Sequence, residues 1–295
     1  MLRPGILGNA TLALFVLAAL GACSSVPKRP AAEGAQEVQR HLRAGIAAAH
    51  AGQHELALAE YVKGLNQEGK NAELHYRAAL SQAALGKLPA AATAYRHALT
   101  LAPDHAGAHE GLGLLLLRQA DHAGARRLLE RAVALKPDAW RSLNGLGALA
   151  DLRRDPAAAD DYYTRALAIN PNAPVLLNNF GYSKYLAGKL DVARALFERA
   201  AAIDPGYGQA WRNLGLVHAR NTQYAEAMRA FGQSMSEAEA AYTTGYVCML
   251  ENRPADAERL FRRAIDLSPA YYADAQDALA RVKVMRSEPA TSLRP

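Results

Sequence analysis

Nine histidines make metal binding the first chemistry to test in this sequence. His41, His75 and His109 are 34 residues apart, and His50 and His54 have the i, i+4 spacing of two ligands on one helix face. Zinc holds imidazole nitrogens at about 2.0–2.1 Å, whereas equivalent positions of packed repeat units lie roughly 10 Å apart. The residues between His50 and His54 belong to an expected turn. We therefore expect no metal site, and we expect the three spaced histidines to pack against a neighbouring helix.

The sequence carries no motif of the common enzyme chemistries. It has no G-x-S-x-G turn, no Walker loop and no H-E-x-x-H helix. Gly111 and Gly113 flank a leucine inside an expected helix, so they do not form a phosphate loop. Asp160 and Asp161 are expected to be solvated, and Cys248 is expected to be buried as a small apolar residue. These observations predict a protein that is not an enzyme and has no cofactor or small-molecule substrate.

The remaining reactive residue is Cys23, which follows a short apolar segment. Arg3 gives the N-terminus a positive charge, and the apolar segment 11–20 is shorter than the roughly 20 residues that span a membrane. The ending Leu-Gly-Ala-Cys at 20–23 resembles the bacterial lipobox. That resemblance implies a lipoprotein signal peptide over 1–22 and a lipidated Cys23, with several acyl chains giving a stable anchor.

The residue after the cysteine indicates the destination of the anchored protein. Ser24 stands where lipoproteins kept in the inner membrane usually carry Asp, so the resemblance implies the outer membrane, facing the periplasm. Residues 23–37 are expected to form the lipid-bearing cysteine and a flexible tether. If Cys23 is incidental to an ordinary signal peptide, a soluble periplasmic protein is expected instead.

The composition is typical of a helical protein. Apolar residues make up 51% and aromatic residues 7%, and Ala and Leu, both good helix formers, are abundant. The net charge of +6 comes from basic and acidic residues mixed along the chain. The sequence contains no block of basic residues of the kind that binds nucleic acid.

Four residue columns repeat with a period of 34 and define the architecture. Small residues recur, alanines follow them by 12, bulky residues follow by 16, and prolines close the middle units at 103, 137, 171 and 205. The small column is Gly45, Ala79, Gly113, Gly147, Gly181 and Gly215, and the bulky column is Tyr61, Tyr95, Leu129, Tyr163, Phe197 and Phe231. Small residues let antiparallel helices approach closely, bulky residues fill the groove between units, and proline ends the second helix.

A seventh unit follows out of phase. Gly245 comes 30 residues after Gly215, so four residues are missing, near Ser234–Glu237. This loss of about one helical turn predicts a shortened second helix or loop in unit six and a bend in the array.

These columns resemble the tetratricopeptide repeat. The resemblance implies an all-α fold, a right-handed superhelical solenoid of about seven helix-turn-helix repeats over 38–270. Unit one departs from the pattern at Gly64 and Gly69. Residues 271–285 are expected to form a capping helix, as arrays require, and 286–295 a disordered tail.

In tetratricopeptide solenoids the first helix of each unit lines a concave groove that binds partner peptides. Helical spacing places on that face residues of the types enriched at binding hot spots, or able to pair with a peptide backbone: Tyr76, Arg118, Arg141, Asn144, Asp151, Asn178, Tyr182, Tyr185, Arg212, Arg220, Tyr242 and Tyr246. The densest part, and the preferred site, comprises Asn178, Tyr182, Tyr185, Arg212, Tyr242 and Tyr246. The Lys and Asn set that clamps a C-terminal carboxylate in some chaperone-binding members is missing.

A lipobox followed by tetratricopeptide units resembles the outer-membrane lipoproteins that assemble pili. The segment 177–227 and the shortened unit at 238–269 are most similar to the TadD family of Tad/Flp pilus assembly. That resemblance implies a scaffold whose protein partners are a secretin or other pilus-assembly components. Open alternatives are a type IV pilus pilotin, a peptidoglycan-hydrolase adaptor, a general periplasmic chaperone and a periplasmic enzyme with a repeat accessory, although no remaining segment is long enough for a catalytic domain.

Overall fold

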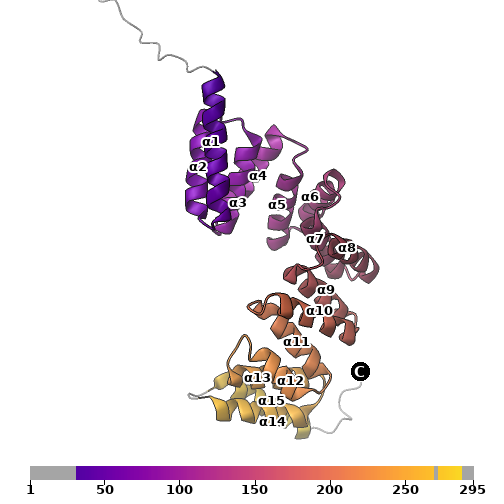
Figure 1. Ribbon diagram of the computed structural model, residues 1–295. Coiled ribbons are helices and arrows are strands. Elements are labelled where there is room, and N and C mark those ends of the chain that lie inside the picture. The colour runs from indigo at the N-terminus through magenta and orange to yellow at the C-terminus, as the bar shows by residue number, and fades with distance from the viewer. Residues whose placement is uncertain (1–30, 269–271, 288–295) are drawn as a thin grey trace, which may run out of the picture.

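The computed structural model describes residues 31–268 and 272–287, and within these residues the secondary structure is entirely helical (Figure 1). The first helices of the seven units are α1 (Ala31–His50), α3 (Ala72–Ala84), α5 (Ala106–Arg118), α7 (Trp140–Leu152), α9 (Pro174–Leu186), α11 (Gly208–Arg220) and α13 (Glu237–Leu250). The second helices are α2 (His54–Gln67), α4 (Leu88–Leu101), α6 (His122–Leu135), α8 (Pro156–Ile169), α10 (Leu190–Ile203), α12 (Tyr224–Phe231) and α14 (Pro254–Leu267). A final helix, α15 (Ala273–Ser287), follows them. The expected all-α solenoid is confirmed.

Each unit turns between its two helices through one residue in the left-handed backbone region. Glycine fills this position at Gly52, Gly86 and Gly188, with φ of 72–75°. Other residues adopt the same conformation at φ of 54–61° in the remaining units: Ala120, Arg154, Thr222 and Asn252. In every unit the following N–H donates to a carbonyl five residues earlier, at 2.8–3.0 Å. This is the helix-ending geometry that satisfies free carbonyls, and it recurs with the sequence period.

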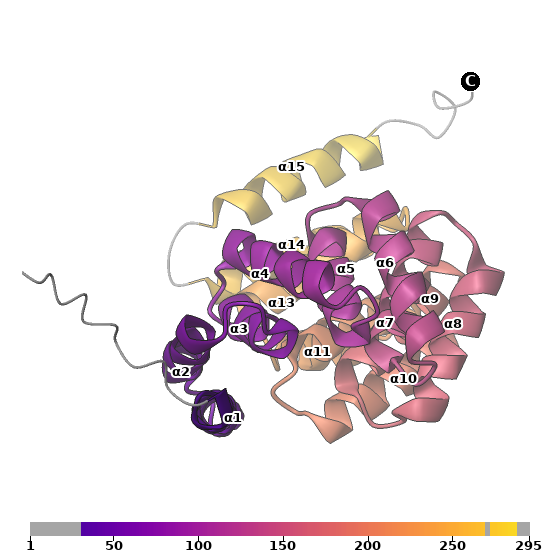
Figure 2. The same cartoon turned by 90° about the horizontal axis from the view of Figure 1, so that it is seen from above.

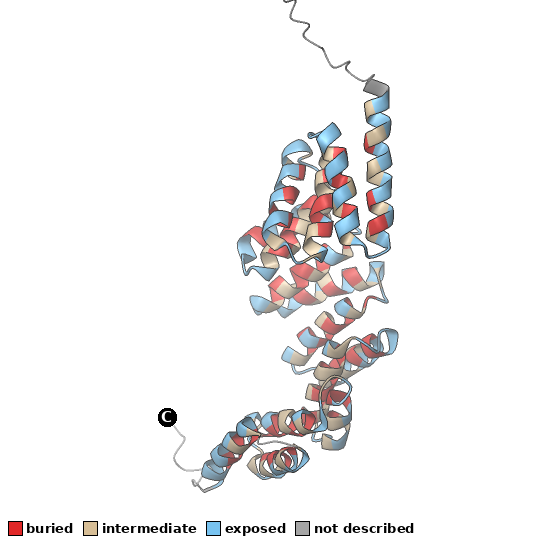
Figure 3. Ribbon diagram, turned by 90° about the vertical axis from the view of Figure 1, so that its left-hand side faces the viewer, coloured by how far each residue is buried: buried red, intermediate tan, exposed pale blue. Residues whose placement is uncertain are grey.

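The small and bulky columns meet inside each unit. A Cβ added at Gly181 would lie 2.7 Å from Phe197, and one added at Gly147 would lie 2.7 Å from Tyr163. The bulky residue also reaches the next unit, since a Cβ added at Gly145 would lie 2.9 Å from Leu129, as would one added at Gly113. The bulky side chains are almost completely buried. Buried residues therefore run as a continuous seam between the helix layers, and no single centre holds the core (Figure 3).

The first helices line the inner side of a curved array. Consecutive first helices approach one another closely through their backbones from α1 to α13, whereas no two consecutive second helices of the described residues do so. Side chains alone join α12 to α14, where the Tyr224 hydroxyl donates to Asp256 at 2.9 Å. Helices on the inside of a curve lie closer to one another than helices on the outside do. In the view from above, α8 and α10 lie at the outside of the coil and α7 and α11 lie nearer its centre (Figure 2).

Unit six carries the phase break. Its second helix, α12, has eight residues, whereas the other second helices have fourteen. The chain turns at Gly232–Met235, and α13 then begins with a capping box. In this box the side-chain oxygens of Ser236 and Glu239 each accept a hydrogen bond from the other residue's backbone N–H. The missing residues thus shorten the second helix and leave α13 a full helix.

The two ends of the array differ from the expected boundaries. The tether was expected to run to residue 37, but α1 begins at Ala31, because Ala, Glu and Gln in this segment favour helix and Val38 is buried against the first units. At the other end, α15 packs on α14 and covers its apolar face, with Ala278 and Val282 buried. It extends to Ser287, two residues into the expected tail.

The expected signal peptide, the lipidation site at Cys23 and residues 288–295 lie outside the described residues. Among the helices that are described, none combines the length and apolar character of a membrane span.

Candidate partner-binding groove

An aromatic and charged row crosses the inner face from unit five to unit seven. The rings of Tyr182 and Tyr185 on α9 stack with centroids 6.0 Å apart. The guanidinium of Arg220, at the end of α11, lies 5.0 Å from the Tyr185 ring centroid. Its Nε is 3.0 Å from Oε1 of Glu251, just after α13. We call Tyr182, Tyr185, Arg220 and Glu251 the inner-face row.

The exposure of the inner-face row suits it to a protein partner. Tyr182 is 43% exposed although it is aromatic, while Tyr185 is half-buried beneath it. Burial raises the pKa of the Tyr185 hydroxyl, opposed by the charge of Arg220, so this phenol stays neutral at physiological pH. The row offers an apolar ring surface next to fixed charges, the combination typical of binding hot spots.

A second aromatic group continues the row on α13. Tyr246 is 40% exposed and its ring lies 6.3 Å from that of Tyr242. Tyr242 itself packs against Phe261 at 5.6 Å and against Tyr272 at 5.4 Å. Tyr246 therefore presents its ring to solvent, whereas Tyr242 mainly fastens the last unit to the segment before α15.

The asparagines predicted to pair with a partner's backbone are bonded to each other. Asn213 Nδ2 donates to Asn178 Oδ1 at 2.8 Å, and Asn179 Nδ2 donates to Asn144 Oδ1 at 3.1 Å. A longer contact of 3.4 Å, from Asn178 Nδ2 to Asn179 Oδ1, joins the two pairs. The prediction for Asn144 and Asn178 is thus corrected, because their side-chain amides are hydrogen-bonded to other asparagines across α7, α9 and α11. We call the four residues the amide ladder.

The other predicted residues divide by exposure. Tyr76 is half-buried, with its ring 4.5 Å from that of His105, and its hydroxyl fills the space beside Gly107, so it joins units two and three. Arg212 is half-buried and donates to Gln209 at 2.8 Å. Arg118 and Arg141 are more open to solvent, and Arg141 lies over the Trp140 ring.

Sequence reasoning missed a column of exposed leucines at the ends of the first helices. Leu152, Leu186 and Leu250 are each more than half exposed, and each follows the small-column glycine of its unit by five residues. Arg118 and Arg220 occupy the same column in units three and six. A hollow of about 450 Å³ lies at the end of the column, lined by Asp151, Leu152, Arg154, Asp155, Pro156, Ser183, Leu186 and Ala187. The 34-residue spacing is a signal that could have identified these leucines. The groove prediction included only aromatic, charged and amide residues, so it left the leucines out.

Asp151, also predicted for the groove, is half-buried. Its two oxygens accept hydrogen bonds from Ser183 Oγ at 2.7 Å and from the Tyr163 hydroxyl at 3.0 Å. Burial raises the pKa of this carboxyl, and the two hydroxyl donors oppose that rise. Asp151 therefore serves the junction between units four and five.

The spaced histidines bind oxygen atoms and do not merely pack. His41 Nδ1 lies 2.7 Å from Glu60, and Nε2 of His75 and of His109 lie 3.0 and 2.7 Å from the carbonyls of Gly69 and Pro103, in the loops before their own helices. The ring of His75 also stacks on the ring of His97 of α4, with centroids 5.4 Å apart, so the expected packing against a neighbouring helix is confirmed for His75. Within the described ranges no cluster of three or more His, Cys, Asp or Glu could hold a metal ion.

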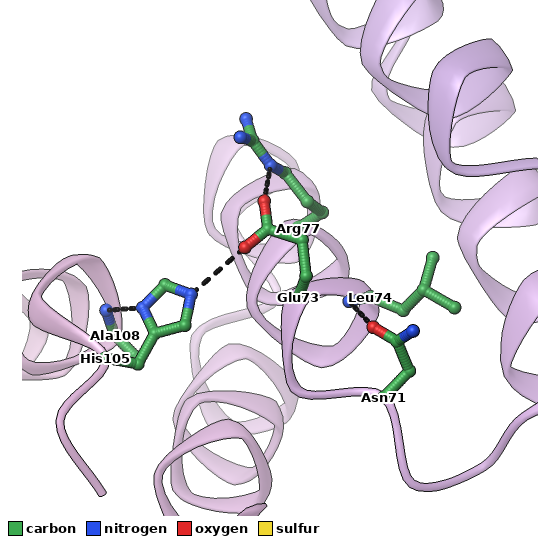
Figure 4. A network of polar contacts seen from close by, with 6 residues as sticks. All are labelled: Asn71, Glu73, Leu74, Arg77, His105 and Ala108. Carbon is green, nitrogen blue, oxygen red and sulfur yellow. Dashed lines mark hydrogen bonds and ion pairs between the residues drawn. The ribbon is translucent and has the colours of Figure 1, made fainter. Parts of the chain in front are cut away.

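One histidine outside the spaced set builds a polar junction between units two and three (Figure 4). His105 accepts the backbone N–H of Ala108 at Nδ1, capping α5, so its Nε2 carries the proton and donates to Glu73 at 3.1 Å. Arg77 Nε donates to the other Glu73 oxygen at 2.6 Å. These bonds lower the pKa of Glu73, His105 contributing most, while burial opposes them.

Asp160, Asp161 and Cys248, the remaining candidates for chemistry, are each paired or buried. Asp160 is not simply solvated, since both its oxygens lie 2.6 Å from Nζ of the buried Lys184. Asp161 pairs with Arg165 on the exposed face. Cys248 is fully buried, as expected, and burial raises the pKa of its thiol.

Comparison with protein families gives a match over most of the array. The family model described as "Tetratricopeptide repeat" matches residues 76–139, 111–174 and 178–235, which together cover more than half of the chain. No curated protein sequence matches.

Solved structures share the fold at low sequence identity. The APC/C hetero-tetramer Cut9-Hcn1 aligns at 18% identity and a TM-score of 0.61, over 78% of this chain and 48% of that chain. The chain thus spans about half the length of this relative. The structure of pilF from Pseudomonas aeruginosa aligns at 18% sequence identity and a TM-score of 0.56, over 84% of this chain and 99% of that chain. PilW, described as a widely conserved type IV pilus biogenesis factor, aligns at 19% sequence identity and a TM-score of 0.58. The alignment covers 70% of this chain and 98% of that chain.

Proposed function

The chain belongs to the tetratricopeptide repeat family and is a scaffold for protein–protein interaction, and we propose that it holds a segment of its partner against the inner face of units five to seven. The observation that carries this proposal is the exposure of Tyr182 and Tyr246 on that face. Large aromatic rings left in solvent at the concave side of a rigid scaffold contribute binding area at low entropic cost.

The chemistry of the surface favours a partner segment with apolar side chains and hydrogen-bonding groups. Leu186 and Tyr182 provide the apolar contact from α9, and Arg220 provides a charged edge. Because Arg220 is shared with Tyr185 and Glu251, its position is fixed before a partner arrives, which reduces the entropy lost on binding.

We further propose that the scaffold assists assembly of a pilus or secretion complex of the Tad/Flp type at the outer membrane. Support comes from the resemblance of residues 20–23 to a lipobox and of the repeats to the TadD family. The fold shared with pilF of Pseudomonas aeruginosa and with PilW is compatible with such a role. In this proposal lipid at Cys23 holds the array at the membrane, and a secretin or another pilus component is the partner.

A role in type IV pilus biogenesis is the second candidate, because PilW is described as a factor of that process. Neighbouring genes separate the two candidates. Genes for a secretin, a pilus ATPase and a small pilin of the Tad/Flp type support the first, whereas genes for cell-wall hydrolases count against both.

Affinity capture tests the proposed groove. The immobilised full chain is incubated with envelope extract of the producing cells, and captured proteins are quantified by mass spectrometry. The Tyr182→Ala/Tyr246→Ala variant should recover at least about tenfold less of any pilus or secretin component, as for the loss of hot-spot residues. Val62→Ala is the matched control, since Val62 is equally exposed but on a second helix. Unchanged recovery with the double variant rejects the inner face as the site.

Membrane attachment is tested separately. The proposal predicts that the wild-type chain incorporates radiolabelled palmitate and sediments with outer membranes, whereas Cys23→Ser does neither. A wild-type chain that stays in the soluble periplasmic fraction contradicts the anchor and leaves the groove proposal standing.

A further inference from the structure

Two junctions between repeat units carry the same pair of hydroxyl groups. At the junction of units four and five, Tyr163 and Ser183 both donate to the carboxylate of Asp151, at 3.0 and 2.7 Å. Counting back three periods of 34 residues from these two donors gives Tyr61 and Ser81, at the junction of units one and two. Counting back the same distance from Asp151 gives Ala49. The donors are therefore repeated, but the acceptor is not.

The place of the missing carboxylate is a cavity. A space of about 210 Å³ is lined by Ile46, Ala49, His50, His54, Tyr61, Arg77, Leu80 and Ser81. All three equivalents of the Asp151 site, Ala49, Tyr61 and Ser81, thus line one space. An alanine in place of aspartate removes the acceptor and leaves room beside the donors.

Two buried polar atoms that line this cavity lack partners. Ser81 is 1% exposed, and its Oγ has no hydrogen-bond partner. Nδ1 of His54 is likewise buried and unbonded. A buried polar group without a partner costs about 1–3 kcal/mol. Such groups normally meet a water, an ion or a ligand, so these atoms indicate that something polar occupies the cavity.

Charge indicates the sign of the occupant. Arg77 lines the cavity and donates from Nε to Glu73 at 2.6 Å (Figure 4), while its guanidinium lies 5.5 Å from the centroid of the Tyr76 ring. Its terminal nitrogens donate no hydrogen bond to the described residues, so they can donate to an anion. Glu73, the nearest acidic group on the same helix, is already shared between Arg77 and His105. An acceptor with a negative charge and two oxygens matches this set, as Asp151 does for the equivalent hydroxyls.

The other junctions do not repeat this arrangement. The positions equivalent to Asp151 and Ser183 hold only apolar or aromatic residues there: Ala83 and Leu115, Leu117 and Leu149, Tyr185 and Val217, Ala219 and Val247. The serine and tyrosine pair is therefore not a general feature of the repeat, and its two occurrences differ in the presence of the carboxylate.

We propose that the cavity between α1, α2 and α3 binds a carboxylate supplied from outside the chain, in the position that Asp151 fills within units four and five. Ser81 and Tyr61 donate to it, and Arg77 and His54 provide the charged and polar wall. The cavity is smaller than the roughly 300–1,000 Å³ of sites for drug-sized ligands, so it takes one carboxylate group with a short stem. This site lies at the opposite end of the array from the inner-face row and does not depend on the pilus role.

Acetate is the probe for the shared chemistry. The full chain, labelled with ¹⁵N, is titrated with sodium acetate, and with sodium chloride at equal ionic strength, while the amide signals of Ala49, His54 and Ser81 are followed. We expect saturable shifts with acetate and not with chloride. Ser81→Ala should weaken the response about tenfold, as for loss of one hydrogen bond to a charged group. Absence of a saturable shift, or an equal response to chloride, overturns the proposal.

Two exchange variants test the equivalence of the junctions. Ala49→Asp places the carboxylate inside the chain and should abolish the acetate response. Asp151→Ala should create a second response, at the amides of Ser183 and Tyr163. If Ala49→Asp folds, as judged by its amide spectrum, and still responds to acetate, the cavity is not the binding site. Should either exchange variant fail to fold, Ser81→Ala still decides the outcome.

The source of the carboxylate is distinguished with peptides. Blocked Gly-Glu-Gly carries only a side-chain carboxylate, blocked Gly-Gln-Gly is its neutral control, and N-acetyl-glycine carries a terminal carboxylate. Shifts with Gly-Glu-Gly and not with Gly-Gln-Gly indicate an acidic side chain of a protein partner. Shifts only with N-acetyl-glycine and acetate indicate a chain terminus or a small carboxylic acid.

Discussion

The side-chain amide of Asn213 donates a 2.8 Å hydrogen bond to Oδ1 of Asn178, across the junction of α11 and α9. Both residues are 4% exposed. Gln209 extends the chain by donating to Asn213 at 3.3 Å. Because buried amides are costly unless they are paired, the amide ladder fixes the register of units four to six more specifically than apolar packing alone.

Asn213→Ala should therefore destabilise the array by about 1–3 kcal/mol, because it leaves the Asn178 oxygen buried without its donor. The measurement is the urea midpoint followed by circular dichroism at 222 nm. Asn66→Ala is the matched control, since Asn66 is exposed on α2, away from the ladder. Equal midpoints for the two variants would show that the ladder contributes nothing to stability.

Gly215→Ala should also destabilise, through overpacking. The added Cβ would lie 2.7 Å from two ring atoms of the buried Phe231, and such insertions typically cost about 1–3 kcal/mol. Thermal melting gives the comparison, with Gly34→Ala as control, because a Cβ at Gly34 meets nothing within 4 Å. Helix propensity predicts that the control is stabilised by up to about 1 kcal/mol. The double variant Gly215→Ala/Phe231→Leu should recover part of the loss, and failure to do so would locate the strain elsewhere.

The fold could be predicted from the sequence because its constraints are local and repeated. The contact of Gly181 with Phe197 is imposed by sterics within one unit, so the spacing of 16 residues reports it directly. The start of α1 was missed for the opposite reason. Residues 31–37 carry few bulky side chains, and only the burial of Val38 shows that this segment is anchored on the first units.

The candidate site was only partly predictable, because helical spacing places a residue on a face but does not say whether a neighbour has already bound it. Spacing correctly put Tyr182 on an exposed inner surface. It could not show that Asn178 is bonded to a residue 35 positions away, since that bond depends on how α9 and α11 approach. The hollow beside Leu186 likewise results from packing between units.

Stability should depend on pH through Glu73. Its hydrogen bonds from His105 and Arg77 lower its folded pKa below the ordinary value of 4.5. The stabilisation is therefore fully present above that value and is lost as pH falls through the lowered pKa. The Glu73 side chain is 37% exposed, so solvent screening limits the effect to within about 1 kcal/mol.

The corresponding measurement is the urea midpoint between about pH 6 and pH 3, the range that includes the ordinary carboxyl pKa. The wild type should lose more stability over this range than Glu73→Gln, whose side chain does not titrate. Glu55→Gln, at an exposed position on α2, should follow the wild type. Parallel curves for wild type and Glu73→Gln would show that the junction of Figure 4 does not contribute through the carboxylate charge.

The shortened helix should be the least protected part of the array's interior. α12 has eight residues where α10 has fourteen, so fewer of its amides are held by helix bonds on both sides. A hollow of about 550 Å³ beside it, lined by residues including Met228, Gly232 and Arg263, removes packing that a full second helix would supply. Local opening is favoured where buried contacts are few.

Native-state hydrogen exchange should therefore give interior amides of α12 rates at least about tenfold above those of α10, a difference of about 1.4 kcal/mol in opening free energy. Since α11 contacts α13 directly, α11 should keep the protection of α9. Loss of protection across α11, α12 and α13 together would instead mean that the whole array separates at unit six, and equal rates in α12 and α10 would mean that the missing turn has no dynamic consequence.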